Sequence, residues 1–485
     1  MAGAVSTRVV VVGGGPAGMM AGYLLARAGV DVLVLEKHAD FLRDFRGDTI
    51  HPSTLEVLDE LGLVEDFLEL PHQKTRRIGV QINGETFPFA DLSGLKFPYI
   101  AFVPQWDFLD FIADRARELP DFRLEMEAEA TELVFTGDAV TGVVAQTAAG
   151  PLRVSADLVI AADGRRSAMR DSAGLERIEI GAPIDVLWLR LPRRPGDPPE
   201  TMGAVGGGAL VAMIARGDYW QCGYVIAKGE GDRIRNEGVE SFRARFAEAA
   251  PLFADRMDTI ASMDDVKLLS VSVDRLKEWT LPGLLCIGDA AHAMSPVGGI
   301  GINLAIQDAV AAANILAHDL RRGPVPRDLL RKVEERRLFP TRVTQRLQVL
   351  AQERAAADPC REGTPDRGAV RIEAAAQHSA AAAHSGPRHR HRRPARTCPG
   401  RSVRRLTGRL SSPRERGEVK ITPPLSSSPN ACGRSDRDGP CAGGSISASP
   451  RRARRPGYRS ARVRASCGSA ASGAPPRPWR SYGYW

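Results

Sequence analysis

Three short apolar runs divide the first three quarters of the chain into units of similar plan. Residues 8–12, 157–162 and 284–287 are rich in Val, Ile, Leu or Ala, and a glycine-bearing turn follows each run. Apolar runs of this length between turn residues are typical of buried strands. A helical pattern comes after each turn, so the chain predicts an α/β fold with a parallel sheet.

The first turn carries three glycines at a spacing with physical meaning. Gly13, Gly15 and Gly18 fit G-x-G-x-x-G between a strand and a helix. The next strand ends at Glu36, roughly 20 residues further on, where an acid can bind a ribose hydroxyl. This arrangement predicts a dinucleotide site. The alternative is a glycine turn that serves only the packing of helix on strand.

The last apolar run leads into the stretch that we expect to carry the chemistry. Asp289 stands at the carboxyl end of this strand, where ligands bind in open α/β sheets. Pro296 and three glycines then precede an Ala-rich helical pattern that begins at Ile302. These glycines are Gly298, Gly299 and Gly301. A helix start without side chains presents unpaired N–H groups and a positive dipole end to an anion or an electron-rich edge.

The middle run ends in Asp163 and Gly164, followed by Arg165, Arg166 and Arg170. An acid at a strand end suits a ribityl or ribose hydroxyl, and a basic cluster suits a phosphate. A solvent-exposed turn is the alternative interpretation.

Residues 75–104 and 181–272 have the alternation of antiparallel strands. Asn83-Gly84 is a hairpin turn signal, and a second hairpin is expected around residues 216–218. The aromatic residues Phe97, Tyr99 and Phe102 line a pocket or pack in the core.

One face of the sheet expected from residues 181–272 would carry side chains that could cover an apolar aromatic ligand. These are Trp188, Met213, Trp220, Cys222 and Tyr224. Packing against a helix behind the sheet explains them equally well. Candidates for a catalytic base in this region are only guesses. They are Tyr219, Tyr224, Asp185 and His72.

Two further helices are predicted from pattern alone. Ser53 with Glu56 three residues later is typical of a capping box at a helix start. Residues 106–118 form a long helical pattern, and two strands flank Gly137-Asp138 in the meander that follows.

The composition changes sharply near residue 356. The chain has 66 basic and 58 acidic residues and a net charge of +8, but 26 of the basic and only 8 of the acidic residues lie beyond this point. The body is therefore acidic, and nucleic acid is not expected as its partner. Cys222 and Cys286 are the only cysteines of the body, which fits a reducing cytoplasm. No uninterrupted apolar run reaches the roughly 18 residues that a membrane span needs.

The tail, residues 355–485, is rich in Arg, Pro, Ser and Gly and has a single lysine, Lys420. Such a composition cannot bury enough apolar surface to fold, so we expect disorder. One hypothesis is a frame-shifted reading of GC-rich DNA in place of the normal end. The other is a basic arm that binds nucleic acid or anionic surfaces. Its Cys and His residues do not match zinc spacings, so no metal is predicted.

Taken in order and spacing, the three motifs resemble those of the single-component FAD-dependent aromatic hydroxylases. This family includes p-hydroxybenzoate hydroxylase and the ubiquinone-pathway hydroxylases. The matching segments are GGGPAG, DLVIAADGRRSAMR and LLCIGDAAHAMSPVGGIGINLAIQDA, and the resemblance covers roughly residues 5–354. It implies a Rossmann-like FAD-binding domain with an inserted substrate domain on a mostly antiparallel sheet, and C-terminal helices broken at Pro340.

The resemblance also implies domain boundaries. The FAD-binding domain would comprise residues 1–74, 105–180 and 273–354. The substrate domain would comprise residues 75–104 and 181–272.

By resemblance, each motif residue acquires an expected role. Gly13, Gly15 and Gly18 lie against the FAD pyrophosphate, and Glu36 binds the adenosine ribose. Cofactor contacts are further expected from Arg46, Gln105, Asp163, Gly164 and Asp289. Arg46 could instead be a solvated loop residue, and many relatives have arginine at the position of Gln105.

The catalytic positions implied by resemblance are Pro296, over the isoalloxazine, and Gly299 and Gly301 beside it. Gly298 to Asn303 would face the pyrimidine edge of the flavin, whose negative charge on reduction a bare helix start stabilises. His292 is expected to be structural, because nothing nearby in the sequence orients it as a base.

The implied reaction is the hydroxylation of an aromatic or polyketide-like small molecule. NADH or NADPH would dock transiently, since no second dinucleotide motif exists, and O2 would form a C4a-hydroperoxyflavin. A reductase or epoxidase of an isoprenoid-like substrate is the alternative on the same fold. Flavin halogenation is disfavoured because the chain has no W-x-W pair. A monomer or homodimer is expected.

Overall fold

A computed structural model describes residues 3–42, 49–82, 85–198, 202–206 and 209–356. These residues all belong to one compact unit of the chain. The predictions for Arg46, for the turn Asn83-Gly84 and for the tail beyond residue 356 lie outside the described residues.

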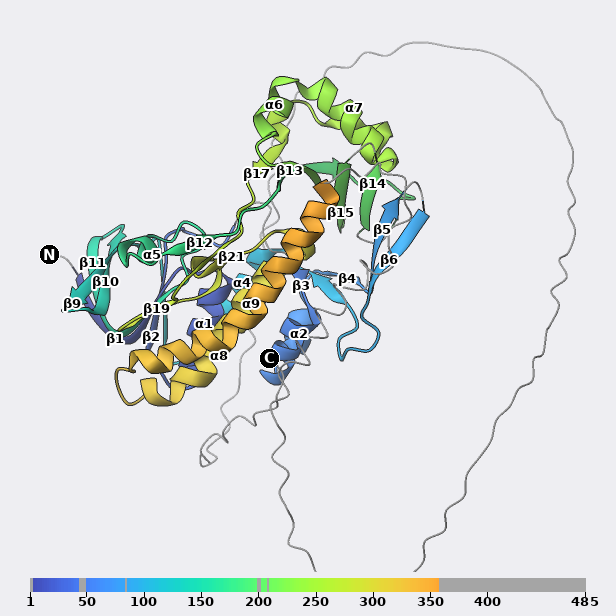
Figure 1. The fold of residues 1–485 in the computed structure, drawn as a ribbon. Coiled ribbons are helices and arrows are strands. Elements are labelled where there is room, and N and C mark those ends of the chain that lie inside the picture. Colours follow the sequence, from blue (N-terminus) through green and yellow to red (C-terminus); the bar gives the residue numbers. More distant parts are fainter. Residues whose placement is uncertain (1–2, 43–48, 83–84, 199–201, 207–208, 357–485) are drawn as a thin grey trace, which may run out of the picture. The chain divides into compact units, whose positions relative to one another are not determined.

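The first sheet is the parallel sheet that the apolar runs predict (Figure 1). Its order is β19-β20-β11-β1-β2-β8, and β9 and β10 form a hairpin beside β11. The strands are β1 (Gly3–Val12), β2 (Val32–Glu36), β8 (Phe122–Met126), β9 (Glu129–Thr136), β10 (Ala139–Thr147), β11 (Gly150–Ala161), β19 (Thr280–Leu281) and β20 (Leu284–Cys286). Val9, Val10 and Val11 are fully buried, as expected for a parallel strand covered on both faces.

Helices cover one face of this sheet. α1 (Pro16–Arg27) packs against α8 (Gly301–Leu320) and against α4 (Gln105–Arg117). The stretch Val297–Leu320 is the one helix of the described residues that is long and apolar enough to cross a membrane by length and composition. Its apolar window is 67% buried inside the protein, which is typical of a core helix.

The last described element is a single helix, α9 (Arg327–Ala356), with Pro340 inside it. The predicted break at Pro340 is therefore wrong. Proline removes only one main-chain donor, and the buried face of α9 continues on both sides of Pro340, from Leu330 and Val333 to Gln345 and Gln348. Packing on both sides outweighs the local defect.

The second sheet is mostly antiparallel, with the order β17-β13-β16-β15-β14-β5-β6. Only the pairing of β14 with β5 is parallel. The strands are β5 (Arg77–Ile82), β6 (Glu85–Asp91), β13 (Ile184–Pro192), β14 (Met202–Gly206), β15 (Ala209–Arg216), β16 (Tyr219–Ala227) and β17 (Lys267–Leu269). Both hairpins predicted for this region are present.

One face of the second sheet packs against α6 (Gly231–Asn236), α7 (Val239–Ala249) and the 3-10 segment η1 (Pro251–Thr259). Met213, Trp220, Cys222 and Tyr224 all lie on this helix side. The packing alternative is thus confirmed for these four residues, because alternate positions of a strand share one face. Trp188 lies on the opposite face, with Val186 and Val271.

Two small three-stranded sheets complete the framework. One comprises β3 (Thr49–Ile50), β7 (Ile100–Phe102) and β4 (Gln73–Thr75), and the other β12 (Arg177–Glu179), β18 (Asp274–Leu276) and β21 (His292–Ala293). Tyr99 and Phe102 are buried, and Phe97 packs against the core, so core packing explains this aromatic cluster.

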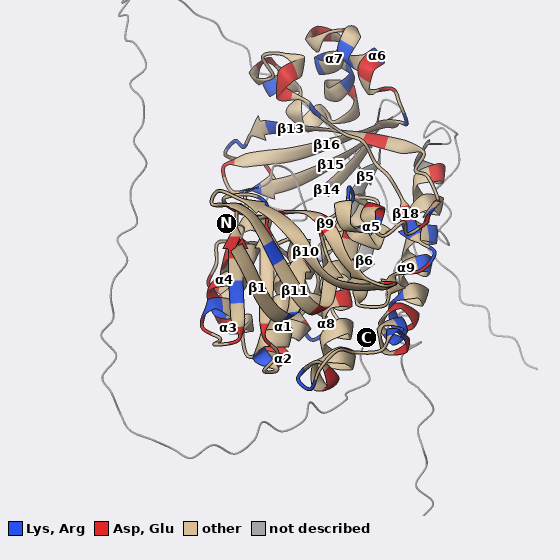
Figure 2. Ribbon diagram, turned by 90° about the vertical axis from the view of Figure 1, so that its left-hand side faces the viewer, with Lys and Arg blue, Asp and Glu red and all other residues tan. Residues whose placement is uncertain are grey.

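The remaining helices are short. They are α2 (Pro52–Glu60), α3 (Val64–Leu68), α5 (Ala168–Ser172), η2 (Met263–Asp265), η3 (Gly288–Ala290) and η4 (Val297–Gly299). The N-cap of α2 is His51, not Ser53. The fixed φ of Pro52 suits the first helical position, so the helix starts earlier than the capping box predicts. Figure 2 shows the charged residues mainly on helices and loops, while the strands of both sheets are largely uncharged.

Candidate active site

The three predicted motifs meet at one edge of the parallel sheet. β20, β11 and β1 are neighbours, and all three point the same way. Hydrogen bonds continue the pairing into the turns: the Ala162 amide donates to Val12 O at 2.8 Å, and the Ile287 amide donates to Ala161 O at 2.9 Å. The segments that carry Gly13, Asp163 and Asp289 therefore lie side by side, as expected for the carboxyl ends of parallel strands.

The glycines of the first turn have different physical roles. A Cβ on Gly13 would lie 2.4 Å from Ala162 O, and a Cβ on Gly18 would lie 1.9 Å from Gly13 O. These two positions need glycine for packing. A Cβ on Gly15 would meet nothing within 4 Å, so Gly15 borders open space.

The start of α1 beside Gly15 is an anion site by its geometry. Within the described residues, the amides of Gly15, Ala17 and Gly18 have no protein acceptor, and Pro16 has no N–H. Unpaired amides at the positive end of a helix favour a phosphate. The site thus fits a pyrophosphate without any basic side chain.

Glu36 stands at the end of β2, next to the glycine turn. Its carboxylate accepts hydrogen bonds from the Gly14 amide at 2.8 Å and from the His38 amide at 3.0 Å. The residue is buried. Glu36 therefore organises the glycine turn directly, which is a task beyond the ribose contact that the sequence predicts.

Asp163 is half-buried and caps α5. It accepts from Ser167 Oγ at 2.5 Å and from the Met169 amide at 3.2 Å. Burial raises its pKa, and these hydrogen bonds oppose the shift. The alternative of a merely exposed turn is wrong, because the carboxylate is held by its own loop.

Arg170 does not belong to a phosphate-binding cluster. Its side chain is 2% exposed, and its guanidinium donates to Arg165 O at 2.9 Å and Ala290 O at 3.3 Å. It ties the middle motif to the last one. Because the predicted phosphate role requires exposed charge, only Arg165 and Arg166 remain available for it.

Asp289 pairs with a residue of the middle motif. Arg165 Nε lies 3.0 Å from Asp289 Oδ2, and both side chains are about one third exposed. Arg165 also donates to Met294 O at 3.3 Å. The carboxylate oxygen that Arg165 does not contact could accept a hydrogen bond from a hydroxyl of a polyol.

The loop before α8 contains two glycines in the left-handed region. Gly298 has φ 77° and Gly299 has φ 61°. A Cβ on Gly299 would lie 2.0 Å from Thr49 Oγ1, and that hydroxyl donates to Gly299 O at 2.7 Å. Gly299 is therefore required by a close contact with β3 as well as by its backbone.

The set of bare amides is smaller than predicted. The Gly299 amide donates to Pro296 O and the Asn303 amide donates to Ile300 O, both at 3.0 Å. Among the described residues 298–303, the amides of Gly298, Ile300, Gly301 and Ile302 have no acceptor, and the last three stand at the start of α8. The positive helix end lies at residues 300–302, inside the predicted range.

Asn303 differs from its predicted role of direct contact with the ring. Its side-chain oxygen accepts from the His51 amide and Thr54 Oγ1, and its nitrogen donates to Thr49 O and Gly299 O. With every donor and acceptor used, Asn303 joins α8 to the segment of β3 and α2.

The sequence analysis missed His51 as a member of this site. Its Nε2 lies 3.1 Å from Gly298 O, so this nitrogen carries the proton and donates. Burial lowers the pKa of His51 to about 4, which keeps the ring neutral near pH 7. Only its position before Pro52 at a helix start could have drawn attention to it.

His292 is structural, but for a reason opposite to the one expected. A partner does orient it: Nε2 lies 2.6 Å from Asp308 Oδ2, and Arg337 Nε lies 2.7 Å from Asp308 Oδ1. All three residues are almost fully buried. The Gly288 amide also donates to Asp308 at 3.0 Å, so this network supports the turn that carries Asp289.

None of the four guessed bases has a free position in the site. Asp185 accepts from Lys228, Gly229 and Val271, and these bonds lower its pKa although burial alone raises it. Tyr224 packs edge-on against Phe242. Of the other two, His72 Nδ1 donates to Leu70 O, 2.7 Å away, and Tyr219 lies beneath Arg190.

Gln105 is the first residue of α4 and is half-buried. It follows β7, which pairs with β3, and Thr49 of β3 contacts Gly299. Gln105 is thus connected to the site through the small sheet of β3, β7 and β4.

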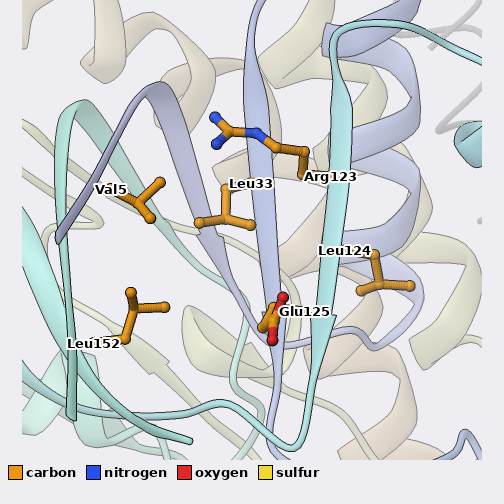
Figure 3. A pocket seen from close by; sticks show the side chains of 6 residues that line it. All are labelled: Val5, Leu33, Arg123, Leu124, Glu125 and Leu152. Atoms are coloured by element: carbon orange, nitrogen blue, oxygen red, sulfur yellow. The ribbon is translucent and has the colours of Figure 1, made fainter. Parts of the chain in front are cut away.

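The described surface also has hollows away from this edge. One, of about 360 Å³, lies along the early part of β1 and β11 and is lined by Val5, Leu33, Arg123, Leu124, Glu125 and Leu152 (Figure 3). Because Val5 stands seven residues before Val12, this hollow is not part of the site. Within the described ranges no group of three or more metal-ligating side chains occurs.

The fold and the site together define a class of protein. A parallel sheet with a glycine turn, two helix starts with bare amides and acids at the strand ends is a dinucleotide-binding flavoprotein framework. Gly288, with φ 60°, lies between α1 and α8: its Cβ would be 2.9 Å from Ala17 Cβ and 3.4 Å from Ala305 Cβ. The two helix starts therefore flank one site.

Residues 6–347 match the family described as FAD binding domain, and the chain belongs to this family. It is 35% identical over 349 residues to 6-methylpretetramide 4-monooxygenase of Streptomyces rimosus, covering 71% of this chain and 83% of that protein. Among solved structures, it resembles OxyS anhydrotetracycline hydroxylase from Streptomyces rimosus, with a TM-score of 0.60 and 26% identity over 77% of this chain and 73% of that one.

The structure of pqsL from Pseudomonas aeruginosa, a probable FAD-dependent monooxygenase, shares the fold. Its TM-score is 0.62 at 20% identity, over 73% of this chain and 98% of that one. The predicted family, fold class and cofactor are confirmed. By its family the protein is an FAD-dependent monooxygenase.

Proposed function

We propose that the convergent edge of the parallel sheet holds FAD between the starts of α1 and α8. The single observation that carries this assignment is the pair of bare helix starts on either side of Gly288. In this arrangement the amides of Gly15, Ala17 and Gly18 bind the pyrophosphate, and Glu36 binds the adenosine ribose while it holds the Gly14 amide.

The redox end of the cofactor would lie at the start of α8. Bound FAD supplies two-electron reduction by NAD(P)H and activation of O2. The amides of Ile300, Gly301 and Ile302 are placed to stabilise negative charge on the pyrimidine edge, since they are oriented before charge develops. Pro296 offers a surface without an N–H beside them, and Asp289 binds the ribityl chain.

We propose two domains for the described residues. Residues 1–74, 105–180 and 273–354 form the FAD-binding domain, and residues 75–104 and 181–272 form the substrate domain. Support comes from the division of strands between the two large sheets. The face of the second sheet that bears Trp188 is the one that we propose for the substrate, because the helices occupy the other face.

The substrate that we propose is a fused-ring aromatic polyketide with phenolic hydroxyls. Relatives named for 6-methylpretetramide and for anhydrotetracycline support this class. Gly223 favours a flat ligand or a flat side chain at this face, because its Cβ would lie 3.2 Å from the ring of Trp188. We further propose O2 as oxidant, a cytoplasmic location and a monomer or homodimer.

Asp289→Ala tests the cofactor assignment. The variant should fold, since the side chain is about one third exposed, but should bind FAD roughly 10- to 100-fold more weakly through loss of hydrogen bonds to a charged group. Flavin content after gel filtration and a fluorescence titration of apoprotein measure this. The control is Asp264→Ala, whose side chain is 94% exposed. Equal FAD affinity in both variants would contradict the placement.

The substrate class has its own test. Stimulation of NAD(P)H consumption is measured with one-ring phenols and with tetracyclic phenols of comparable acidity, and hydroxylated product is identified by mass spectrometry. We expect turnover of the fused-ring compounds. Product formed only from one-ring phenols would overturn the proposed class while leaving the FAD site unaffected.

A further inference from the structure

Three glutamines of α9 lie on one buried face of the helix and contact the loop before α8. Gln345, Gln348 and Gln352 are 1%, 1% and 2% exposed. Their spacing of three and four residues places them in one row along the helix. A buried row of polar side chains is costly unless each is hydrogen-bonded, so their contacts define their role.

Most contacts of this row are to main chain. Gln345 Nε2 donates to Asp274 O at 2.7 Å and to Ala293 O at 3.1 Å, and its side-chain oxygen accepts from Arg275 at 3.2 Å. Gln348 accepts from the Ser295 amide at 3.2 Å and donates to Ser295 O at 3.1 Å and to Val297 O at 2.9 Å. Gln352 donates to Ser295 Oγ, which also accepts from the Val297 amide at 3.2 Å.

Every carbonyl of residues 293–297 therefore has a donor. Besides those bound by the glutamines, Met294 O accepts from Arg165 at 3.3 Å and Pro296 O accepts from the Gly299 amide at 3.0 Å. Apart from the two-residue strand β21 this segment has little regular structure, yet each of its carbonyl groups accepts a hydrogen bond. It is a rigid segment held from the α9 side.

Gln348 is the central member of the row, because it alone binds both neighbours of Pro296. One side-chain amide supplies an acceptor and two donors, which a carboxylate or an apolar side chain of the same length cannot do. The carbonyls of Ser295 and Val297 are thereby turned toward α9. The next residues are Gly298 and Gly299, followed by the bare amides at the start of α8.

We infer that Gln348 is a positioning residue for the hydroxylation reaction: it sets the main chain around Pro296 and so places the start of α8 against the flavin. The inference rests on the proposed FAD site. It assigns a reaction-specific task to a helix that has no residue in any of the three sequence motifs.

The test uses the full-length protein with three variants. Gln348→Ala removes all three contacts, and Gln348→Glu keeps the acceptor but loses the donors to the two carbonyls. The matched control is Gln345→Ala, which removes an equally buried glutamine of the same helix that contacts Asp274 and Ala293 instead. Thermal unfolding reports the cost to the fold in each case.

Two readouts separate positioning from stability. Hydrogen exchange of apoprotein, read on a peptide spanning residues 294–302, should speed up about tenfold in both Gln348 variants and little in Gln345→Ala. The FAD dissociation constant should rise about tenfold in the Gln348 variants and the flavin midpoint potential should fall, because the helix amides no longer meet the reduced ring as well. Gln345→Ala should unfold at a lower temperature without these changes.

The Gln348→Glu variant adds a pH-dependent readout, which is not expected if Gln348 only fills space in the core. A buried carboxyl group is protonated at low pH and can then donate one of the lost hydrogen bonds. FAD affinity of this variant should therefore improve from pH 8 to pH 6 relative to the parent. The variant also carries the test if Gln348→Ala does not fold.

Equal effects of Gln348 and Gln345 substitutions on exchange and on FAD affinity would overturn the inference, as would a Gln348→Glu variant with parental affinity and potential at both pH values. Failure of the parent itself to bind FAD would instead overturn the proposed function. The exchange measurement on apoprotein keeps the two failures distinguishable.

Discussion

Individual glycines of the first turn serve either the protein or the ligand, and the structure separates the two groups. Gly18 is needed by Gly13 O, 1.9 Å from its hypothetical Cβ, whereas the space next to Gly15 is open. Gly15 has φ −73°, which any residue can adopt. The glycine pattern therefore combines a packing requirement with a binding requirement.

This difference predicts opposite behaviour of two alanine variants. Gly18→Ala should destabilise apoprotein by about 1–3 kcal/mol or more, because the backbone must move. Gly15→Ala should leave the unfolding of apoprotein nearly unchanged and weaken FAD binding by crowding the ligand. Urea unfolding without FAD and titration with FAD measure the two effects. Unchanged FAD affinity in Gly15→Ala would show that the open space is not the pyrophosphate site.

Contacts with residues far away in the sequence fix the position of the glycines before α8. Thr49, His51 and Asn303 connect β3 and α2 to the glycines before α8. Asn303 was expected to touch the cofactor, but its groups are all bound by protein. Such a role depends on neighbours about 250 residues away in the chain, which no local pattern reveals.

Single elements show how packing modifies local preference. α9 continues through Pro340, and α2 begins at Pro52 and not after Ser53. In the second sheet, the pattern places Met213, Trp220, Cys222 and Tyr224 on one face correctly, but the placement of Trp188 on that face is wrong. The pattern also does not say which face the helices cover. The choice depends on α6, α7 and η1, which lie further along the chain.

A buried ion pair braces the second sheet against η1. Asp197 accepts from Arg256 at 2.6 and 3.0 Å, from Trp220 Nε1 at 2.8 Å and from the Arg194 amide at 2.9 Å. Arg256 above all holds the pKa of Asp197 well below its usual range. Both side chains are at most 5% exposed, so screening by solvent is weak.

The buried pair of Asp197 and Arg256 predicts that the free energy of unfolding depends on pH. The folded state holds the Asp197 carboxyl ionised below the pH at which the unfolded chain protonates it, near 3.9. The contribution of this group is therefore complete above about pH 4 and is lost as pH falls further. Asp197→Asn should cost about 3–5 kcal/mol at pH 7, by leaving Arg256 buried without its partner.

Urea unfolding at pH 7 and pH 3 tests this prediction. The difference between parent and Asp197→Asn should shrink at pH 3. The control is Asp138→Asn, an exposed residue in the turn between β9 and β10, which should follow the parent at both pH values. If the difference in free energy of unfolding between the parent and Asp197→Asn is the same at pH 7 and pH 3, the assignment of the low pKa to Asp197 is contradicted.

At the scale of the whole molecule, charge and function are separated along the chain. The residues up to 356 carry 40 basic and 50 acidic side chains, so the net positive charge of the protein comes from the remainder. All residues of the proposed FAD site, and the three glutamines of α9, precede this point. The family match ends at residue 347.

This separation predicts the behaviour of a chain that ends at residue 356. It should bind FAD with the stoichiometry and affinity of the full chain and should lose retention on a cation exchanger at pH 7, because its net charge is negative. The same two measurements on the full chain are the comparison. Loss of FAD on truncation would show that the C-terminal residues contribute to the flavoprotein.

Salt-dependent binding to DNA, measured on the full chain and on the chain that ends at residue 356, tests whether the tail is a basic arm. Binding by the full chain that disappears in the shortened chain would favour a basic arm. An intact reading frame across the codons for residues 345–365 would exclude the frame-shift hypothesis.

The sequence by itself determined the parallel sheet and the three motifs, because each depends on short-range order: an apolar run, a glycine turn and a helix start follow one another within about thirty residues. The order of these motifs carries the family resemblance that implied FAD. The sequence also predicted both hairpins of the second sheet from turn residues alone. Only the tertiary structure decided which atoms of the motifs are free. Hydrogen bonds from α9, β3 and α2 occupy Asn303, the Gly299 amide and the carbonyls beside Pro296, and leave residues 300–302 bare. These partners come from distant segments, so their effect arises only when the chain is folded.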